Sequence, residues 1–213
     1  MVGVIHRDES GPALLRRWLE EIQPDVITLE LSHYGIRFRR ELGDQYKEII
    51  VRVTNKREER GERCNSEAFA SLISYVSIPY EYEAISGYAA EQSIPFHLID
   101  MDFFSYVKLR AIEDLLSKDN IEAMLADMEG MNGNLELATA RLYFDKGINV
   151  AHYDREMYIR DRYMAARIDD LMKHRQNKKF LHVCGWQHLQ DPSGLYSHFN
   201  PIKVFSHDKT FCL

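Results

Sequence analysis

The chain has 213 residues, of which 45% are hydrophobic and 28% are charged, and its formal net charge at pH 7 is −6. This composition is that of an ordinary globular protein, so it excludes disordered, fibrous and low-complexity classes, and the length predicts one domain spanning 1–213. The acidic balance argues against a surface that follows nucleic-acid phosphates, so nucleic acid is not expected as a partner.

The first 31 residues predict a strand, a helix and a second strand. Met1 to Ile5 and Val26 to Leu31 are short and almost continuously apolar, which is typical of strands covered on both faces. Between them, Ser10 to Pro12 gives a helix start signal, and apolar residues at positions 14, 15, 18, 19 and 22 form a helical stripe. A strand–helix–strand unit of this length favours parallel strands.

Long helical stretches separate the remaining predicted strands, which are Pro95 to Ile99, Phe180 to Cys184 and Pro201 to Phe205. The last begins with proline and is therefore predicted as an edge strand. About three helices are expected between the second and third strands, with breaks near Asn55 to Asn65 and at Pro79. About four more are expected from Asp102 to Lys179, with breaks near Asn120 and at Gly130 to Gly133. The predicted fold is α/β, with a small, mainly parallel central sheet of about 4–5 strands surrounded by many helices.

A histidine or an acidic residue follows each of four predicted strands. His6 follows the first strand, Glu30 the second, Asp100 the third and His188 the fourth. Because ligands bind beyond the carboxyl ends of the strands in an open parallel sheet, these side chains are expected to meet at one edge. Two imidazoles and two carboxylates there suit a metal site or acid/base chemistry, whereas the alternative interpretation is four unrelated polar strand ends.

The predicted helix from about His152 to His174 carries charges inside its apolar stripe, which is formed by Tyr153, Met157, Met164, Ile168 and Leu171. Arg160 and Asp161 fall within that stripe, and a buried charge requires a partner. Arg160 is therefore expected to pair with Glu30 or Glu81, or to contact an anionic ligand.

Several familiar motifs are absent, namely the nucleophile elbow, the zincin helix, the Walker loop and the dinucleotide fingerprint. His182 and Cys184 share one face of a predicted strand, and with His188 they suggest either a thiol or metal cluster or, as the favoured interpretation, a buried structural cysteine.

The positions of charged residues and cysteines predict the cellular location of the protein. The longest stretch without a charged residue, Ala68 to Tyr80, is shorter than the roughly 18 apolar residues of a membrane-spanning helix. Charged residues within the first ten positions interrupt any secretory segment. Cys64, Cys184 and Cys212 show no paired spacing, so neither a disulfide framework nor a structural zinc site is expected. A cytoplasmic protein without membrane contact is the prediction.

The order of these motifs resembles the TraB/PrgY/GumN and Tiki superfamily, which is related to erythromycin-esterase-like and ChaN-like proteins. The resemblance rests on two Gly-x-x-His elements, Gly3 to His6 and Gly185 to His188, and on a second strand that ends in Leu29-Glu30-Leu31. Three further segments look like family motifs in the right order: Glu81 with Ile85 and Ala89, Leu98-Ile99-Asp100, and Arg160 to Ala165.

The sequence also departs from the family pattern. The family commonly places an arginine shortly after the second-strand Glu-Leu, whereas the first arginines here are Arg37 and Arg39. Ile159 stands where the TraB branch often has glutamate, and the C-terminal membrane part of some members has no counterpart after the last predicted strand.

The resemblance implies a hydrolase of the peptidase or esterase type acting on a small-molecule or peptide substrate. In one version a divalent metal (manganese, zinc or cobalt) is held by residues drawn from His6, Glu30, Glu81, Asp100 and His188. In the other, a histidine and a glutamate activate water directly. Central catalytic roles fall to His6, Glu30 and His188, and Glu81, Asp100 and Arg160 support them. Arg160 would either stabilise the developing oxyanion or orient Glu30. The alternatives are a non-catalytic protein that sequesters a peptide, signal or haem-like ligand, and an oligomerising scaffold; a homo-oligomer is compatible with each.

Overall fold

We describe a computed structural model of the chain, and the description covers residues 1–126, 134–146 and 154–209. The chain divides into two compact units. Unit 1 comprises Met1–Ser32, Tyr80–Met101 and Glu136–Leu213, and unit 2 comprises His33–Pro79 and Asp102–Leu135. The expectation of one domain over 1–213 stays a prediction.

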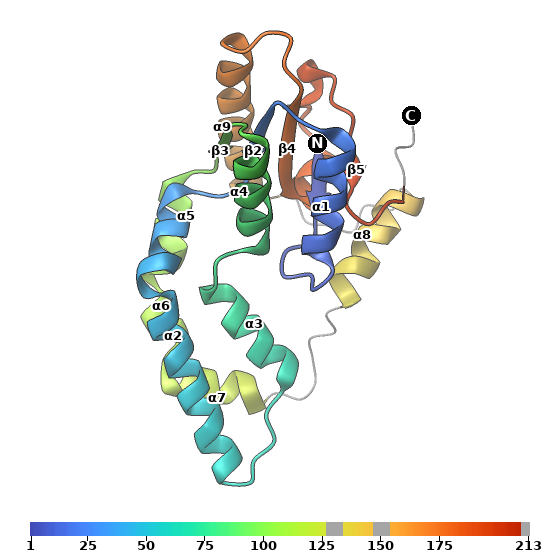
Figure 1. Cartoon of the computed structure of the whole chain (residues 1–213). Helices are drawn as coiled ribbons and strands as arrows, with labels where there is room; N and C mark the ends of the chain where they lie inside the picture. Colours follow the sequence, from blue (N-terminus) through green and yellow to red (C-terminus); the bar gives the residue numbers. More distant parts are fainter. Residues whose placement is uncertain (127–133, 147–153, 210–213) are drawn as a thin grey trace. The chain divides into compact units, whose positions relative to one another are not determined.

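Unit 1 is an α/β structure built on a five-stranded sheet in which every described pairing is parallel. The strand order is β3-β2-β4-β1-β5 (Figure 1). The bounds are β1 Val2–Val4, β2 Val26–Leu29, β3 Phe96–Leu98, β4 Phe180–Gly185 and β5 Val204–Phe205. The predicted fold class is confirmed: four strands lie within the predicted apolar runs, β4 extends one residue beyond its run to Gly185, and β5 is an edge strand.

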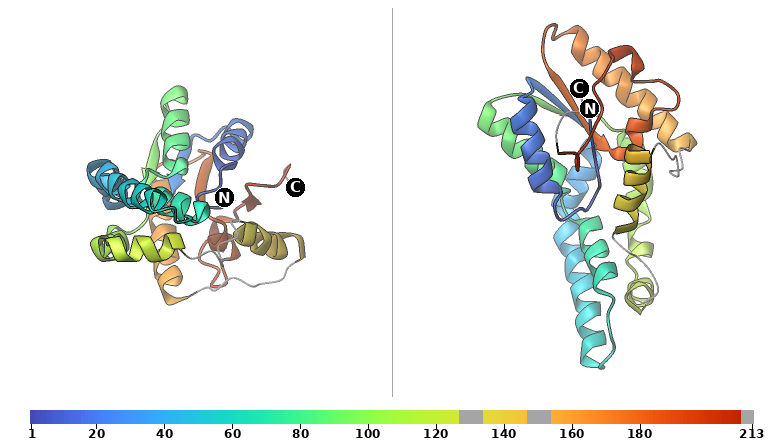
Figure 2. Two further views of the ribbon diagram at one scale, coloured as in Figure 1. Left: turned by 90° about the horizontal axis from the view of Figure 1, so that it is seen from below. Right: turned by 90° about the vertical axis from the view of Figure 1, so that its right-hand side faces the viewer.

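Helices cover both faces of this sheet. Helices α1 (Gly11–Ile22) and α4 (Tyr80–Gln92) lie on one side, and α9 (Arg155–Lys173) lies on the other (Figure 2, right). Successive strand residues point to opposite faces, so Leu181 and Val183 of β4 join the apolar cluster formed with α1 and α4. The continuous apolar character of the strands follows from this double coverage.

The intervening residues of β4 face the α9 side. The Nδ1 atom of His182 lies 3.1 Å from Oγ1 of Thr28 on β2, and its ring stacks on that of Tyr196 with centroids 5.8 Å apart. Burial lowers the pKa of His182 to about 4 and raises the pKa of the Cys184 thiol well above its usual value. Cys184 is thus a buried, protonated thiol, as the structural interpretation predicted.

The remaining described helices of unit 1 are α8 (Asn134–Lys146) and two 3₁₀ helices. Helix α8 packs beside a cluster of Ile5, Trp186 and Phe205. Two short 3₁₀ helices, Trp186–Gln190 and Ser197–Phe199, follow β4.

Unit 2 is helical and has its own apolar cluster. Its helices are α2 (His33–Glu59), α3 (Ser66–Val76), α5 (Asp102–Arg110), α6 (Ile112–Leu115) and α7 (Lys118–Ala126). Asn65 begins α3, since its side chain accepts hydrogen bonds from the backbone N–H groups of residues 67 and 68.

The helices mostly follow the predicted pattern. Helices α2, α3 and α4 are the three expected between β2 and β3, and their ends fall at the predicted breaks. The break predicted near Asn120 is confirmed: α6 ends at Leu115 and α7 begins at Lys118, and the backbone N–H of Asn120 donates to Oγ of Ser117, 3.4 Å away. Gly130 to Gly133, His152, Tyr153 and Cys212 lie outside the described residues. Among the described helices, none combines the length and apolar character needed to cross a membrane.

Candidate functional site

The predicted strand-end residues meet at the carboxyl edge of the sheet. His6 follows β1, Glu30 follows β2, Asp100 follows β3, and His188 lies in the 3₁₀ helix directly after β4. Because these strands run in the same direction, their carboxyl ends bring the four side chains to one edge of unit 1.

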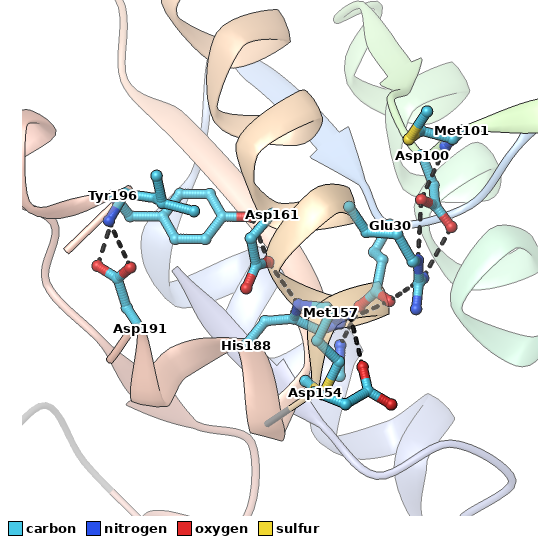
Figure 3. A network of polar contacts seen from close by, with 12 residues as sticks. Glu30, Asp100, Met101, Asp154, Met157, Asp161, His188, Asp191 and Tyr196 are labelled. Atoms are coloured by element: carbon cyan, nitrogen blue, oxygen red, sulfur yellow. Dashed lines mark hydrogen bonds and ion pairs between the residues drawn. The ribbon is translucent and has the colours of Figure 1, made fainter. Parts of the chain in front are cut away.

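Glu30 is buried at the centre of this group (Figure 3). Its Oε1 lies 2.8 Å from Nε2 of His188 and 2.5 Å from Nη2 of Arg160. Its Oε2 accepts a 2.6 Å hydrogen bond from the backbone N–H of Gly185. Both oxygens of this carboxylate are therefore occupied by donors from the chain itself.

Arg160 of α9 connects Glu30 with Asp100. Its Nε lies 3.1 Å from Oδ1 of Asp100 and its Nη2 lies 2.7 Å from Oδ2, which is a two-point arginine–carboxylate contact. The predicted pairing with Glu30 is confirmed, and the alternative pairing with Glu81 is wrong because Glu81 binds His6 instead. Nη1 of Arg160 donates to no described residue, and the side chain keeps 16% of its surface exposed.

His188 has a carboxylate at each ring nitrogen. Nε2 faces Glu30, and Nδ1 lies 2.5 Å from Oδ1 of Asp161, which also accepts a 2.9 Å hydrogen bond from the hydroxyl of Tyr196 (Figure 3). Burial acts to lower the pKa of His188, but the charges of Glu30 and Asp161 outweigh it and raise that pKa to about 10. His188 is consequently an imidazolium at neutral pH, with both nitrogens donating.

The same charges act back on Glu30. Burial alone raises the pKa of this carboxyl, yet the positive charges of His188 and Arg160 hold it well below its usual range. The Arg160 guanidinium is likewise stabilised in its charged form, since Glu30 and Asp100 raise its pKa despite burial. Glu30, His188 and Arg160 are therefore charged at neutral pH.

His6 lies beside this network in a different setting. Its Nδ1 lies 2.7 Å from Oε1 of Glu81, and the His6 side chain is 48% exposed whereas that of Glu81 is 3% exposed. A Cβ atom placed on Gly185 would lie 2.8 Å from Nε2 of His6 and 3.5 Å from Oε2 of Glu30. The absence of a side chain at Gly185 thus lets Nε2 of His6 lie close to the Glu30 carboxylate.

Three residues of the site were not among the predicted site residues. Asp161 carried a signal, because it interrupts the apolar stripe of its helix, but its partner could not be named from the sequence. Tyr196 lies in an irregular segment with no periodic pattern, and nothing in the sequence indicates its contact with Asp161. Gly185 was noted only as the first residue of a Gly-x-x-His element.

The predicted metal ligands do not fit a metal ion in this arrangement. No lone pair is left on an imidazolium that donates from both nitrogens, as His188 does, and the oxygens of Glu30 and Asp100 accept from cations or backbone N–H groups. Within residues 1–126, 134–146 and 154–209, no group of three or more His, Cys, Asp or Glu side chains could hold a metal.

Comparisons with protein-family models, curated proteins and solved structures found no match to this chain. The family resemblance stated above therefore stays a hypothesis.

The site contains two groups of residues with different chemical character, a buried ion-pair network and a partly exposed acid/base pair. Glu30, Asp100, Arg160, Asp161 and His188 pair with one another in a buried network of three carboxylates and two cations. The pair of His6 and Glu81 has the form of an acid/base group, in which a buried carboxylate orients a half-exposed imidazole.

Proposed function

We propose that this protein is a hydrolase of the esterase or peptidase type in which His6 activates a water molecule. The proposal rests on one observation: the buried carboxylate of Glu81 lies 2.7 Å from Nδ1 of the half-exposed His6, and the Nε2 side of the ring lies beside Glu30. A carboxylate at one ring nitrogen fixes the tautomer, so the other nitrogen of a neutral imidazole acts as the base.

The proposed reaction needs no group beyond the chain, the substrate and water. Nε2 of His6 takes a proton from water, and the resulting hydroxide oxygen bonds to the carbonyl carbon of an ester or amide. The carbon–oxygen or carbon–nitrogen bond then breaks, and the proton returns from His6 to the leaving group.

Arg160 is proposed to contact the substrate carbonyl. Its Nη1 donates to no described residue, while its other donors hold Glu30 and Asp100. A guanidinium fixed in this way stabilises the negative charge that develops on the carbonyl oxygen. In this proposal the ion pair of Glu30 and His188 lies next to the reacting water and forms no bond to it.

The test compares His6→Ala and Glu81→Gln with wild type on a panel of nitrophenyl esters and fluorogenic peptides. We expect His6→Ala to abolish turnover and Glu81→Gln to lower it by about 10²–10⁴-fold, which is the contribution of general acid–base catalysis. His174→Ala, which changes an exposed histidine just beyond α9, is the matched control and should keep full turnover. Turnover by His6→Ala at the wild-type rate would contradict the proposal.

Metal dependence is tested on the same panel. Protein purified without chelator is analysed for manganese, zinc and cobalt, then assayed before and after dialysis against a chelator. The direct water-activating version predicts unchanged turnover after dialysis, whereas loss of turnover and its recovery with one of these metals would favour the metal version.

A second candidate is a protein that holds a ligand without altering it. The observation in its favour is that Glu30, Asp100 and His188 pair with groups of the chain itself, as residues of a structural network do. A ligand that binds with micromolar affinity and is recovered unchanged would favour this candidate, particularly if no substrate in the panel is turned over.

We further propose that the chain is a cytoplasmic member of the TraB/PrgY/GumN and Tiki superfamily that takes a small-molecule or peptide substrate. Support comes from the Gly-x-x-His elements, whose histidines both reach the same edge of the sheet. A homo-oligomer is compatible with this proposal and is tested by light scattering. Fractionation of cells expressing the tagged protein tests the location.

A further inference from the structure

The segment that carries His6 has contacts that the proposed reaction does not use. This segment, which we call the His6 loop, comprises residues Ile5 to Ser10 between β1 and α1. It contains a residue in an unfavourable conformation, since Arg7 has a φ angle of 64°, which is uncommon for a residue other than glycine. A short exposed loop in such a conformation requires surrounding contacts to maintain it.

Tyr80 contacts both ends of the loop. Its hydroxyl donates a 3.0 Å hydrogen bond to the carbonyl oxygen of Ile5 at the start. At the other end its ring lies over Gly11, where a Cβ atom would be only 2.3 Å from the ring. Tyr80 directly precedes Glu81, so adjacent residues of α4 hold adjacent residues of the loop, Ile5 and His6.

His207 contacts the middle of the loop. Its Nε2 lies 3.1 Å from Oδ2 of Asp8, and both side chains are largely buried. Asp8 in turn accepts hydrogen bonds from the backbone N–H of Ser10 and from its hydroxyl, so this carboxylate organises the second half of the loop. Its backbone carbonyl also accepts the N–H of Gly11.

The His207 ring is itself held in place. It stacks on Phe205 with centroids 4.9 Å apart, and its Nδ1 lies 3.2 Å from the hydroxyl of Ser206. Burial lowers the pKa of His207, which favours a neutral ring that donates from Nε2 to Asp8 and accepts from Ser206 at Nδ1. The charged groups around this ring are Asp8, Arg141, Asp208 and Arg17.

We propose that Tyr80 and His207 are positioning residues for His6, with the Tyr80–Ile5 and His207–Asp8 contacts fixing the His6 loop so that the imidazole lies between Glu81 and Gly185. This inference rests on the proposed function, because it assigns His6 the central role. Tyr80 acts through the backbone carbonyl of Ile5, and His207 acts through the Asp8 carboxylate that accepts the backbone N–H of Ser10.

The test follows the His6 imidazole directly by nitrogen–proton NMR, together with kcat and KM. His207→Leu and Tyr80→Phe should shift or broaden the His6 ring signals and change their pH titration. Each should lower kcat by about tenfold or more, with KM changed much less, since a displacement of about 1 Å in a reacting group costs up to roughly 100-fold. His207→Gln, which keeps an N–H donor near the position of Nε2, should recover most of the loss.

Asp25→Asn is the matched control. Asp25 likewise joins distant segments through its side chain, to Lys178 and to the backbone N–H of Lys179, but at the start of β2. It should leave the His6 signals and kcat unchanged. His6 signals in His207→Leu and Tyr80→Phe that match wild type would overturn the positioning proposal whatever the activity. Absence of turnover in wild type would instead contradict the proposed function, while the NMR comparison would still decide the positioning role. Should His207→Leu fail to fold, Tyr80→Phe carries the same comparison with wild type.

Discussion

His6 and His188 each end a Gly-x-x-His sequence, yet their surroundings give them different chemical properties. His188 is buried between two carboxylates and is held as an imidazolium. Nδ1 of His6 lies 2.7 Å from the Glu81 carboxylate, and the His6 side chain is half exposed. A ring that permanently carries its proton cannot take another from water, so the two carboxylates that flank His188 make it unsuited to be a base.

Gly185→Ala is expected to separate activity from stability. The added Cβ would lie 2.8 Å from Nε2 of His6, and the half-exposed His6 ring can move away from it. The backbone angles of Gly185, φ −55° and ψ 140°, suit alanine. We expect turnover to fall by up to about 100-fold. The free energy of unfolding should change by about 1 kcal/mol or less.

Kinetics and urea denaturation measure these two effects. Gly87→Ala is the control, because a Cβ there meets no atom within 4 Å. Wild-type turnover in Gly185→Ala would show that the position of the His6 ring does not limit the reaction.

His188→Ala is expected to destabilise the protein strongly. It removes the cation from between Glu30 and Asp161, both buried, and leaves two carboxylates with reduced compensation. Breaking a buried ion pair in this way costs about 3–5 kcal/mol. Chemical denaturation compares this variant with His174→Ala, an exposed change that should cost under about 0.5 kcal/mol. A loss below about 1 kcal/mol in His188→Ala would contradict the buried network.

At the scale of elements, the sheet was predictable because its strands are short apolar runs with both faces covered. Phe180 to Cys184 and Val26 to Leu31 illustrate this pattern. Parallel direction was predicted for the first two strands from the helix between them, and the pairings of β1 and β2 with β4 are both parallel. The start of α7 at Lys118 was predicted only to within a few residues, because Asn120 and Ser117 are both common at helix ends and only the contact of the Ser117 hydroxyl distinguishes them.

The candidate site was predictable only where residues follow strands. Glu30, Asp100 and His188 could be placed at one edge because parallel strands end together. The partner of Asp161 and the role of Tyr196 depend on how an irregular segment returns to α9, and no local pattern encodes that path. The pairing of Glu81 with His6 similarly required the position of α4.

Gly43→Ala tests the packing of helices within unit 2. A Cβ on Gly43 of α2 would lie 2.5 Å from the backbone carbonyl oxygen of Val76 at the end of α3, so the two helices must separate. We expect a loss of about 1–3 kcal/mol in the free energy of unfolding.

Gly87→Ala provides the matched comparison, since it is also a glycine inside a helix but has open space around it. It should stabilise the protein by about 0.5–1 kcal/mol through helix propensity. Thermal or urea unfolding measures both variants, and similar values for the two would contradict the close approach of α2 and α3.

At the scale of the whole molecule, the two buried histidines predict a maximum of stability near pH 6.5. His188 has its pKa raised to about 10, so its contribution is complete below pH 6.5 and is lost as the pH rises toward 10. His182 has its pKa lowered to about 4, so its contribution is complete above pH 6.5 and is lost as the pH falls toward 4. Each slope approaches about 1.4 kcal/mol per pH unit.

Urea denaturation from pH 4 to pH 10 measures this profile. His182→Asn, which can keep a contact with Thr28, should flatten the acidic side and leave the alkaline side unchanged. A wild-type profile that rises continuously from pH 6.5 to pH 10 would contradict the charged state of His188.

The order of strands in the sheet has a consequence for how the chain folds during synthesis. Strand β4 lies between β1 and β2, although it is made about 150 residues after β2. Until β4 has left the ribosome, the strand that pairs with both β1 and β2 is missing. Glu30 also lacks its hydrogen-bond donors from Gly185 and His188. Such long sequence separation slows folding and leaves strand edges exposed in the nascent chain. The segment from β4 to His188 therefore supplies both the central strand of the sheet and the donors of Glu30, so a nascent chain acquires these two features together.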